Sequence, residues 1–315
     1  HGDRNSNAIK FLSRFTDWTK YEHKVRAFLS DGRTTPLPVN RNTLEDIFRI
    51  KLENDAETLI FLENLRNRNL NPSNTDEFFL SKVGEELTNL FFRPYTKKMW
   101  GIDPTKLEVN VGARLPVRLN RDDRYFSDNF QFLPKNGYKN LFDNMLNHEN
   151  IKVSLNTIFD KSMEKYYSHC FLSIPVDNYF NYIFGQLPYR SLIFEERIHK
   201  NKNLSAPTIN FTDNSKYTRM TQWDLLSNSP NRESNIHTVT YEIPVEISKN
   251  KGEYYYPVKT RISNKIYKQY ERLASNLENV TFCGRTGLFR YLDMVPAVSI
   301  HLQIANQFLK KLKVK

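Results

Sequence analysis

The sequence predicts a mixed α/β fold in which a helical region is inserted near the start of the chain. Apolar residues recur at helical spacing between residues 42 and 100. From residue 150 onward, short runs rich in β-branched and aromatic residues replace that pattern, which is typical of strands. The C-terminal stretch then predicts a buried strand followed by a long amphipathic helix.

Three helices are predicted in the first part of the chain, after a turn at residues 30–33. The segment "NTLEDIF" offers Asn42 or Thr43 as an N-cap ahead of acidic residues, so a helix is expected to begin there. A second helix is predicted over residues 55–65. The third is predicted to begin at Thr75 as N-cap, and its apolar residues at helical spacing are Phe78, Phe79, Val83, Leu87, Leu90 and Phe91.

The second half of the chain predicts a series of strands, which cover residues 150–156, 166–174, 189–196, 207–213, 217–221 and 236–245. A helix is predicted near residues 262–276. The run "NVTFCG" (279–284) predicts a buried strand, and the final helix is expected over residues 294–311.

The composition is that of a folded globular protein. With 315 residues, 39% of them hydrophobic, the chain is long enough for about two domains and a core of ordinary size. No run approaches the roughly 18 apolar residues that a membrane-spanning helix needs, so no membrane span is expected. The two cysteines, Cys170 and Cys283, are too few for a disulfide framework and favour a reducing compartment. A cytoplasmic location is therefore predicted.

The net charge of +11 at pH 7 allows three interpretations. The simplest is a solvated, lysine-rich surface that ends in the basic tail "LKKLKVK". A small ligand that carries phosphate is the main alternative. A nucleic-acid partner is not expected, because the basic residues are scattered and no recognisable binding module is present.

Several kinds of chemistry can be set aside. The seven histidines and two cysteines are dispersed without a Cys-x-x-Cys or His-x-x-x-His pair, so no metal site is expected. A Gly-x-Ser-x-Gly elbow is missing, which argues against a serine hydrolase of that type. The ten glycines include neither a Gly-x-Gly-x-x-Gly loop nor a Walker loop, so this chain alone could not hold a dinucleotide in the usual way.

Three stretches concentrate residues that could bind phosphate. Residues 91–101, "FFRPYTKKMWG", interleave aromatic and cationic side chains, although a helix end that packs into the core would have the same composition. Residues 114–126, "RLPVRLNRDDRYF", contain four arginines, whose planar guanidinium groups bind phosphate through two bonds at once. A surface loop of ion pairs is the alternative there. Residues 284–294, "GRTGLFRYLDM", follow a predicted strand and lead into a helix, and a helix N-terminus after a strand binds anions. A plain strand-turn-helix would need the same glycines.

Taken in order, these residues resemble the UDP-galactopyranose mutase family, flavoenzymes that interconvert UDP-galactopyranose and UDP-galactofuranose. The resemblance runs through nearly the whole chain. It rests on the order and spacing of six motifs, "YTKKMWG", "RLPVRLNRDDRYF", "FLPKNGY", "YTRMT", "YYYPV" and "GRTGLFRYLDM".

The resemblance implies a fold with three parts: a Rossmann-like FAD domain that is incomplete in this chain, an inserted helical domain and an antiparallel sheet domain. Residues 1–41 would be a remnant of the FAD and sheet domains, and residues 42–110 the helical domain. Residues 111–275 would form the sheet-rich substrate domain with part of the FAD domain. Residues 276–315 would supply the last strand and helix of the FAD domain.

The resemblance also implies the reaction. In that family, N5 of reduced FAD attacks the anomeric carbon of the sugar and UDP leaves. The sugar ring of the adduct then opens and recloses in contracted form, and UDP returns to displace the flavin, with no net redox change. The product would supply a galactofuranose polysaccharide of the cell surface. Cations and hydroxyl donors would stabilise the departing diphosphate. A homodimer is a further expectation, because bacterial members of the family are commonly dimers.

Carried over motif by motif, the resemblance assigns a substrate site. Arg114 and Arg219 would flank the diphosphate and act in catalysis. The remaining substrate residues would bind diphosphate oxygens, stack on the uracil, line the sugar and uridine pocket or support its wall, and they are Tyr125, Tyr256, Tyr291, Tyr95, Trp100, Phe91 and Phe92.

On the flavin side, the resemblance places Gly284, Arg285 and Asp293 near the cofactor. His1 matches the family's histidine beside the flavin and is the third predicted catalytic residue. The family's N-terminal glycine-rich FAD unit has no counterpart in these residues, so we expect it on a removed or separate stretch. Departures gather on this side. Ile174 and Phe132 replace glycines, while Val295 and Pro296 stand where a second aspartate normally follows the methionine.

Two functions follow from this pattern. The first is a UDP-galactopyranose mutase, although we expect the chain alone to bind FAD weakly or not at all while it retains some affinity for UDP. The alternative is a non-catalytic homologue that binds UDP-sugar, or pairs with an active mutase, without binding FAD.

Overall fold

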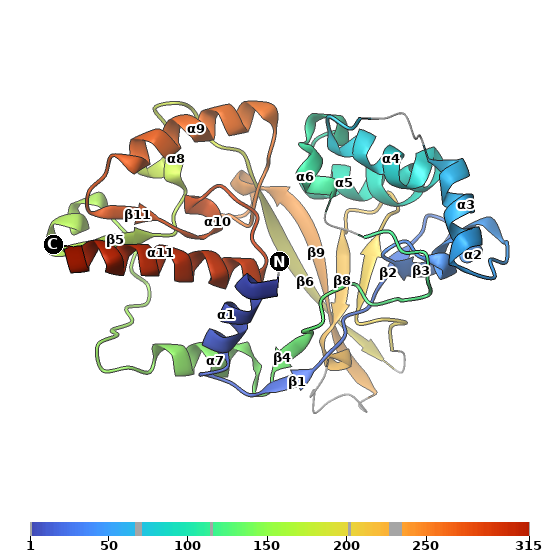
Figure 1. Ribbon diagram of the computed structural model, residues 1–315, viewed down its shortest axis with the longest axis horizontal. Coiled ribbons are helices and arrows are strands. Elements are labelled where there is room, and N and C mark those ends of the chain that lie inside the picture. The colour runs from blue at the N-terminus through green and yellow to red at the C-terminus, as the bar shows by residue number, and fades with distance from the viewer. Residues whose placement is uncertain (1, 67–70, 114–115, 201–202, 227–234, 315) are drawn as a thin grey trace.

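The computed structural model describes residues 2–66, 71–113, 116–200, 203–226 and 235–314. It confirms the mixed α/β class. A seven-stranded sheet lies in the middle, with a helical region on one side and a second region of helices and two parallel strands on the other (Figure 1).

The helical region has the three predicted helices and a π-helical continuation. Its elements are α2 (Arg41–Phe48), α3 (Asp55–Leu65), α4 (Thr75–Leu87), the π-helix η1 (Thr88–Phe92), α5 (Arg93–Trp100), the 3-10 turn η2 (Pro104–Lys106) and α6 (Val109–Gly112). The predicted bounds of α3 are confirmed.

Two predicted N-caps were wrong. The N-cap of α2 is Asn40 rather than Asn42 or Thr43, because its side chain accepts the Thr43 amide while the Thr43 hydroxyl accepts the Asn40 amide, each at 3.1 Å. The N-cap of α4 is Asn74 rather than Thr75, and its side-chain oxygen accepts the Glu77 amide at 2.9 Å. In both cases an asparagine just upstream satisfies the free amides of the first turn.

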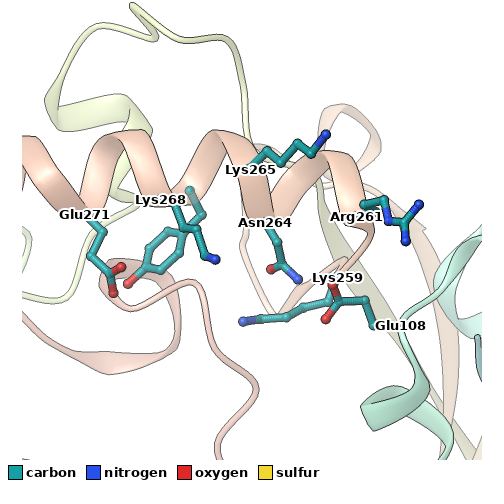
Figure 2. A pocket seen from close by; sticks show the side chains of 8 residues that line it. Glu108, Lys259, Arg261, Asn264, Lys265, Lys268 and Glu271 are labelled. Carbon is teal, nitrogen blue, oxygen red and sulfur yellow. The ribbon is translucent and has the colours of Figure 1, made fainter. Parts of the chain in front are cut away.

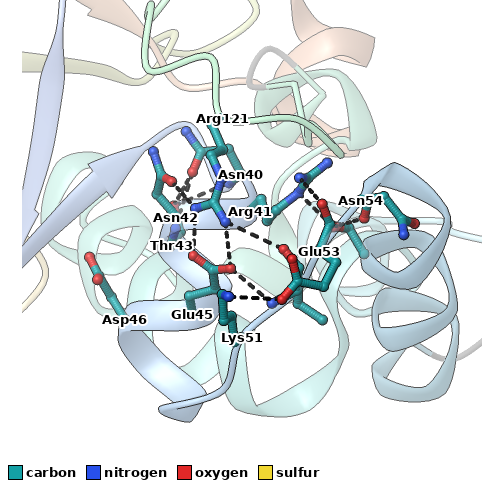
Figure 3. A network of polar contacts seen from close by, with 12 residues as sticks. Asn40, Arg41, Asn42, Thr43, Glu45, Asp46, Lys51, Glu53, Asn54 and Arg121 are labelled. Atoms are coloured by element: carbon teal, nitrogen blue, oxygen red, sulfur yellow. Dashed lines mark hydrogen bonds and ion pairs between the residues drawn. The ribbon is translucent and has the colours of Figure 1, made fainter.

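A polar network fastens the loop after α6 to α2 and α3 (Figure 3). Arg121 donates to both carboxylate oxygens of Glu45, at 2.5 and 2.7 Å. Arg41, only 8% exposed, donates to the Leu119 carbonyl at 3.1 Å and pairs with Asp55. This loop is the one that carries Tyr125, so the network helps to position the site.

The sheet has the strand order β10-β6-β9-β8-β7-β2-β3 and is antiparallel except where β2 pairs with β7. Its strands are β2 (Val25–Phe28), β3 (Thr34–Leu37), β6 (Tyr189–Lys200), β7 (Thr208–Phe211), β8 (Arg219–Gln222), β9 (Ile236–Glu246) and β10 (Tyr256–Pro257). A separate antiparallel pair joins β1 (Trp18–Lys20) to β4 (Phe132–Pro134).

In the remaining region, β5 (Cys170–Leu172) and β11 (Val280–Phe282) pair in parallel. Around them lie α1 (Gly2–Leu12), α7 (Gly137–Leu146), α8 (Val176–Tyr179), α9 (Arg261–Ser275), α10 (Gly284–Gly287) and α11 (Met294–Val314). Three 3-10 turns complete the fold, η3 (Lys161–Tyr166), η4 (Trp223–Leu225) and η5 (Ile247–Lys249).

The strand predicted at residues 150–156 was wrong. The segment is irregular, and every residue in it is exposed. Its apolar and polar residues alternate as in a strand, but alternation stabilises a strand only where a neighbour offers hydrogen bonds and a surface to cover. Leu155, 81% exposed, shows that neither is present.

Candidate functional site

Three neighbouring strands place an amide, a cation and a carboxylate side by side. The register pairs Asn210 of β7 with Arg219 of β8, and Arg219 with Glu242 of β9. Arg219 Nη1 lies 3.7 Å from Glu242 Oε1. Within the described residues, neither Arg219 Nε nor Asn210 Oδ1 has a hydrogen-bond partner. Since buried polar atoms are normally hydrogen-bonded, this face of the sheet is suited to a polar ligand.

Helix α5 and the entrance to β2 bring two more titratable groups toward Arg219. Burial raises the pKa of Tyr95, in the first turn of α5, while the charge of Arg219 acts in the opposite direction. Burial and the same arginine lower the pKa of His23 to about 4. The His23 ring is therefore neutral at pH 7, and its Nδ1 lies 2.8 Å from the Tyr21 hydroxyl oxygen.

Tyr125 reaches this group from the loop after α6. Its amide donates to the His23 carbonyl at 2.7 Å, and the two rings meet edge to face at 5.9 Å. Arg219 and Tyr125 lie close enough to interact electrostatically. The fold thus gathers Arg219, Tyr95 and Tyr125, as the resemblance implied, and adds His23.

An aromatic stack continues the site away from the sheet. Trp100, at the end of α5, meets Tyr256 of β10 edge to face with ring centres 6.2 Å apart. Tyr256 lies parallel to Tyr291 at 5.2 Å, with 10° between the ring planes. Burial, aided by Tyr291, raises the pKa of Tyr256 to about 12, so its hydroxyl keeps its proton at neutral pH.

Arg285 lies against both rings of the stack. Its guanidinium carbon lies 4.6 Å from the centre of the Tyr291 ring and 5.5 Å from that of Tyr256. The guanidinium also donates two hydrogen bonds to the Leu292 carbonyl, at 2.7 and 2.9 Å. Arg285 is thereby fixed beside two of the predicted diphosphate-binding tyrosines.

Phe91 and Phe92 lie beneath α5 instead of within the site. They are 2% and 7% exposed and belong to the core of the helical region. Phe92 stacks on Phe79 with ring centres 4.3 Å apart. Their contribution is packing that holds the helix carrying Tyr95 and Trp100. Arg114 and His1, two of the three predicted catalytic residues, lie outside the described residues.

Comparison with known proteins settles the family. A family model described as UDP-galactopyranose mutase matches residues 90–291. The chain belongs to the UDP-galactopyranose mutase family.

Relatives of this family match almost the whole chain. A probable UDP-galactopyranose mutase of Klebsiella pneumoniae is 31% identical over 309 residues, covering 97% of this chain and 79% of the relative. A dTDP-fucopyranose mutase of Escherichia coli is 32% identical over 318 residues, covering 98% of this chain and 83% of the relative. A solved structure of reduced UDP-galactopyranose mutase has a TM-score of 0.69 at 17% identity, with 94% of this chain and 79% of that chain covered. That structure shows the fold, whereas the sequence matches show the family.

The family implies FAD, and β5 and β11 show where part of its site would lie. Ligands of parallel sheets bind beyond the carboxyl ends of the strands. At that end, Gly284 has φ +71°, and an added Cβ would lie 1.9 Å from Ser173 Oγ. Arg285 follows directly, and Asp293 immediately precedes α11. A tight glycine turn, a cation and a carboxylate at this edge fit one side of a flavin site.

The prediction that a helix N-terminus just after Gly284 binds an anion was wrong. Helix α10 has only four residues, and α11 does not begin until Met294. The Gly284 amide donates to His301 Nε2 at 2.8 Å, so it is not available to an anion. The positive charge at this edge comes from Arg285 instead.

A second concave surface lies between α9 and α6 (Figure 2). Its lining consists of Glu108, Lys259, Arg261, Asn264, Lys265, Tyr267, Lys268 and Glu271. Three of the cations, Arg261, Lys265 and Lys268, project from α9, Lys259 lies just before it, and two glutamates offset part of their charge. A solvated basic face explains this composition without a ligand.

Proposed function

We propose that this protein interconverts UDP-galactopyranose and UDP-galactofuranose. Membership of the family supports the overall reaction. The observation that carries the proposal for this chain is the unpartnered Nε of Arg219 within a cluster of tyrosines. A diphosphate would supply an acceptor for Nε of Arg219, and the tyrosine hydroxyls would donate to its remaining oxygens.

In this reaction the protein binds the nucleotide sugar, orients it and neutralises the charge of its diphosphate. When bound, reduced FAD supplies the nucleophile for the anomeric carbon. Arg219 and, in the predicted scheme, Arg114 stabilise the negative charge that develops as the diphosphate departs. Because Tyr256 and Tyr95 stay protonated, they remain hydrogen-bond donors throughout. Trp100 limits the space beside them and holds the nucleotide sugar in place.

The predicted division into parts is included in the proposal. The helical residues 42–110 present Tyr95 and Trp100, and the sheet-rich residues 111–275 present Arg219, Tyr125 and Tyr256. Gly284, Arg285 and Asp293 in residues 276–315 would form the flavin-side wall. The predicted cytoplasmic location and homodimer remain predictions, and so does the absence of a nucleic-acid partner. Within the described residues, no helix has the length and apolarity needed to cross a membrane.

A second nucleotide sugar is a candidate substrate. The E. coli dTDP-fucopyranose mutase matches this chain as well as the Klebsiella relative does, at 32% against 31% identity. The two reactions contract the same kind of ring, and the substrates differ in base, ribose and the sugar's C6. Competition between UDP and dTDP for the purified protein separates them.

The test combines nucleotide binding with turnover. Arg219→Ala should weaken UDP binding by about 1.5–3 kcal/mol, or roughly tenfold to a hundredfold, since a charge-assisted pair is lost. Arg197→Ala is the matched control, because Arg197 pairs with Val239 in the register and projects from the opposite face of the sheet. Unchanged UDP affinity in Arg219→Ala, measured by calorimetry, would remove the assigned site.

Turnover separates the mutase from the non-catalytic alternative. With reduced FAD and UDP-galactofuranose, chromatography should show UDP-galactopyranose accumulating in proportion to enzyme. UDP binding without any turnover would favour the non-catalytic homologue.

A further inference from the structure

His301 of α11 makes two hydrogen bonds, both to backbone groups. Its Nδ1 lies 2.6 Å from the Ala297 carbonyl oxygen, one turn earlier on the same helix. Its Nε2 lies 2.8 Å from the Gly284 amide nitrogen, at the first residue of α10 (Figure 1). The imidazole therefore links the last helix to the turn that follows β11.

The two partners determine the protonation of the ring. A carbonyl can only accept a hydrogen bond and a backbone amide can only donate one. Nδ1 must then carry a proton and Nε2 must offer its lone pair, which describes the neutral Nδ1–H tautomer. A protonated imidazole has no lone pair left for Gly284. The contact thus specifies one chemical state of His301, which packing alone would not do.

The residue after Gly284 belongs to the ligand site. Arg285 lies against the rings of Tyr291 and Tyr256, and both of its hydrogen bonds go to the Leu292 carbonyl. The turn between these residues is short, since the Arg290 amide donates back to the Arg285 carbonyl at 2.9 Å. A shift of the Gly284 backbone would accordingly move the guanidinium and the tyrosine stack.

The first residue of the turn is a glycine, so its own backbone preference does not fix its conformation. Gly284 adopts φ +71°, a conformation that glycine enters easily and also leaves easily. Other anchors lie further along: the Tyr189 hydroxyl donates to the Thr286 carbonyl at 3.0 Å, and Phe289 is fully buried. His301 supplies the side-chain acceptor for the turn at its start.

We propose that His301 is a positioning residue for the substrate site, which acts by holding the Gly284 amide and thereby fixing Arg285 beside Tyr256 and Tyr291. The inference rests on the proposed function, because it takes Tyr256 and Tyr291, which Arg285 contacts, to bind the nucleotide diphosphate. It assigns His301 no contact with the ligand.

The test uses UDP as the probe and three variants of the full chain. His301→Ala removes the acceptor and should weaken UDP binding about threefold to tenfold, the range for one neutral hydrogen bond. His301→Gln keeps a side-chain oxygen that can accept the Gly284 amide, and should return the affinity to within about twofold of the unmodified protein. Thermal melting of each variant shows whether the fold is retained.

A double-mutant cycle shows whether the effect passes through Arg285. In an Arg285→Ala background, His301→Ala should change UDP affinity less than twofold, because coupled residues are not additive. Nitrogen NMR of the histidine ring should also show Nδ1 protonated and Nε2 unprotonated.

The outcomes separate this inference from the proposed function. If the unmodified protein binds neither UDP nor dTDP, the proposed function fails and the inference fails with it. If the unmodified protein binds UDP and His301→Ala binds it equally well, only the inference is overturned. Additive effects in the Arg285→Ala background, or an Nε2–H tautomer, would also overturn it.

Discussion

Replacing Gly84 with alanine should destabilise the protein far more than the same change at other glycines of similar φ. Gly84 interrupts α4 with φ +79° and ψ 178°, a region of backbone space that is essentially restricted to glycine. An added Cβ would lie 2.0 Å from the Leu65 carbonyl oxygen and 2.6 Å from its carbon. These are backbone atoms at the end of α3, so no side-chain rotation can relieve the contact.

The magnitude follows from two costs. Holding a non-glycine residue in this conformation costs of order 1–3 kcal/mol. Inserting a carbon into a packed site costs typically about 1–3 kcal/mol more. Gly84→Ala should therefore lower the free energy of unfolding by roughly 2–6 kcal/mol. Gly252 is the control, because its φ is +81° but no atom lies within 4 Å of the added Cβ. Gly252→Ala should show only the conformational cost of an alanine at positive φ, about 1–2 kcal/mol.

Chemical denaturation followed by circular dichroism measures both variants, with stability taken from the midpoint at an unchanged m-value. UDP binding adds a second measurement. Thr88 donates its hydroxyl to the Gly84 carbonyl, and the π-helix that starts at Thr88 leads directly into α5. A displaced Gly84 should thus move Tyr95 and Trp100 and weaken UDP binding, whereas Gly252→Ala should not. Equal midpoints for the two variants would refute the close approach of α3 to α4.

Two further predictions concern acid stability and the pocket wall. Hydrogen bonding to Arg121 lowers the pKa of Glu45 to about 2 from its ordinary 4.5, so the ion pair stabilises the fold above pH 4.5 and this contribution is lost as the pH falls toward 2. Between pH 5 and 3, Glu45→Gln should therefore lose less stability than the unmodified protein. The difference in the free energy of unfolding, taken from denaturation midpoints, should be no more than about 1 kcal/mol, because the ion pair is accessible to solvent. Trp100→Ala should weaken UDP binding in calorimetry while costing well under the about 3–5 kcal/mol that a core tryptophan would. A large stability loss with intact binding would place Trp100 in the core.

Elements with strong local signals were predicted correctly from the sequence. Helix α3 has its predicted bounds, and α9 begins within one residue of its prediction. The strands around Arg219 and Val239 were also found, because their β-branched residues lie in a sheet that covers them. At these places the local sequence pattern and the tertiary environment favour the same secondary structure, so the local pattern was enough to predict it.

Elements whose conformation depends on their tertiary neighbours could not be predicted from the sequence. Residues 150–156 alternate like a strand but have no partner, and α7 (Gly137–Leu146) was not predicted although it is regular. The parallel pairing of β2 with β7 joins Val25 to Thr208, more than half the chain apart, and no local pattern specifies such a register.

The same reasoning explains which site residues were missed. Motif resemblance found Arg219, Tyr125 and Tyr256, because each lies within a recognisable run. His23 and Asn210 lie in no such run. They reach Arg219 only because β2 pairs with β7 and β7 with β8. The one available signal was the alternation that puts His23, Val25 and Ala27 on one face of a strand, and it identifies a face without identifying what lies opposite.

The site draws on residues held by two hydrophobic cores and by the sheet. Tyr95 and Trp100 depend on the core beneath α4 and α5, which includes Phe79 and Phe92. Arg285 depends on the core around Phe282 and Phe289. Arg219 projects from the sheet between them. The first core also includes Val25 and Ala27 of β2, so it packs the helical region directly against the sheet, and further contacts link these parts to each other and to the region around Arg285. The stacking of Tyr256 on Tyr291, the edge-to-face contact of Trp100 with Tyr256 and the bond from the Glu108 amide to the Lys259 carbonyl are such contacts. Trp100, Tyr256 and Tyr291, which the proposed function places against the ligand, thus also join these parts of the protein.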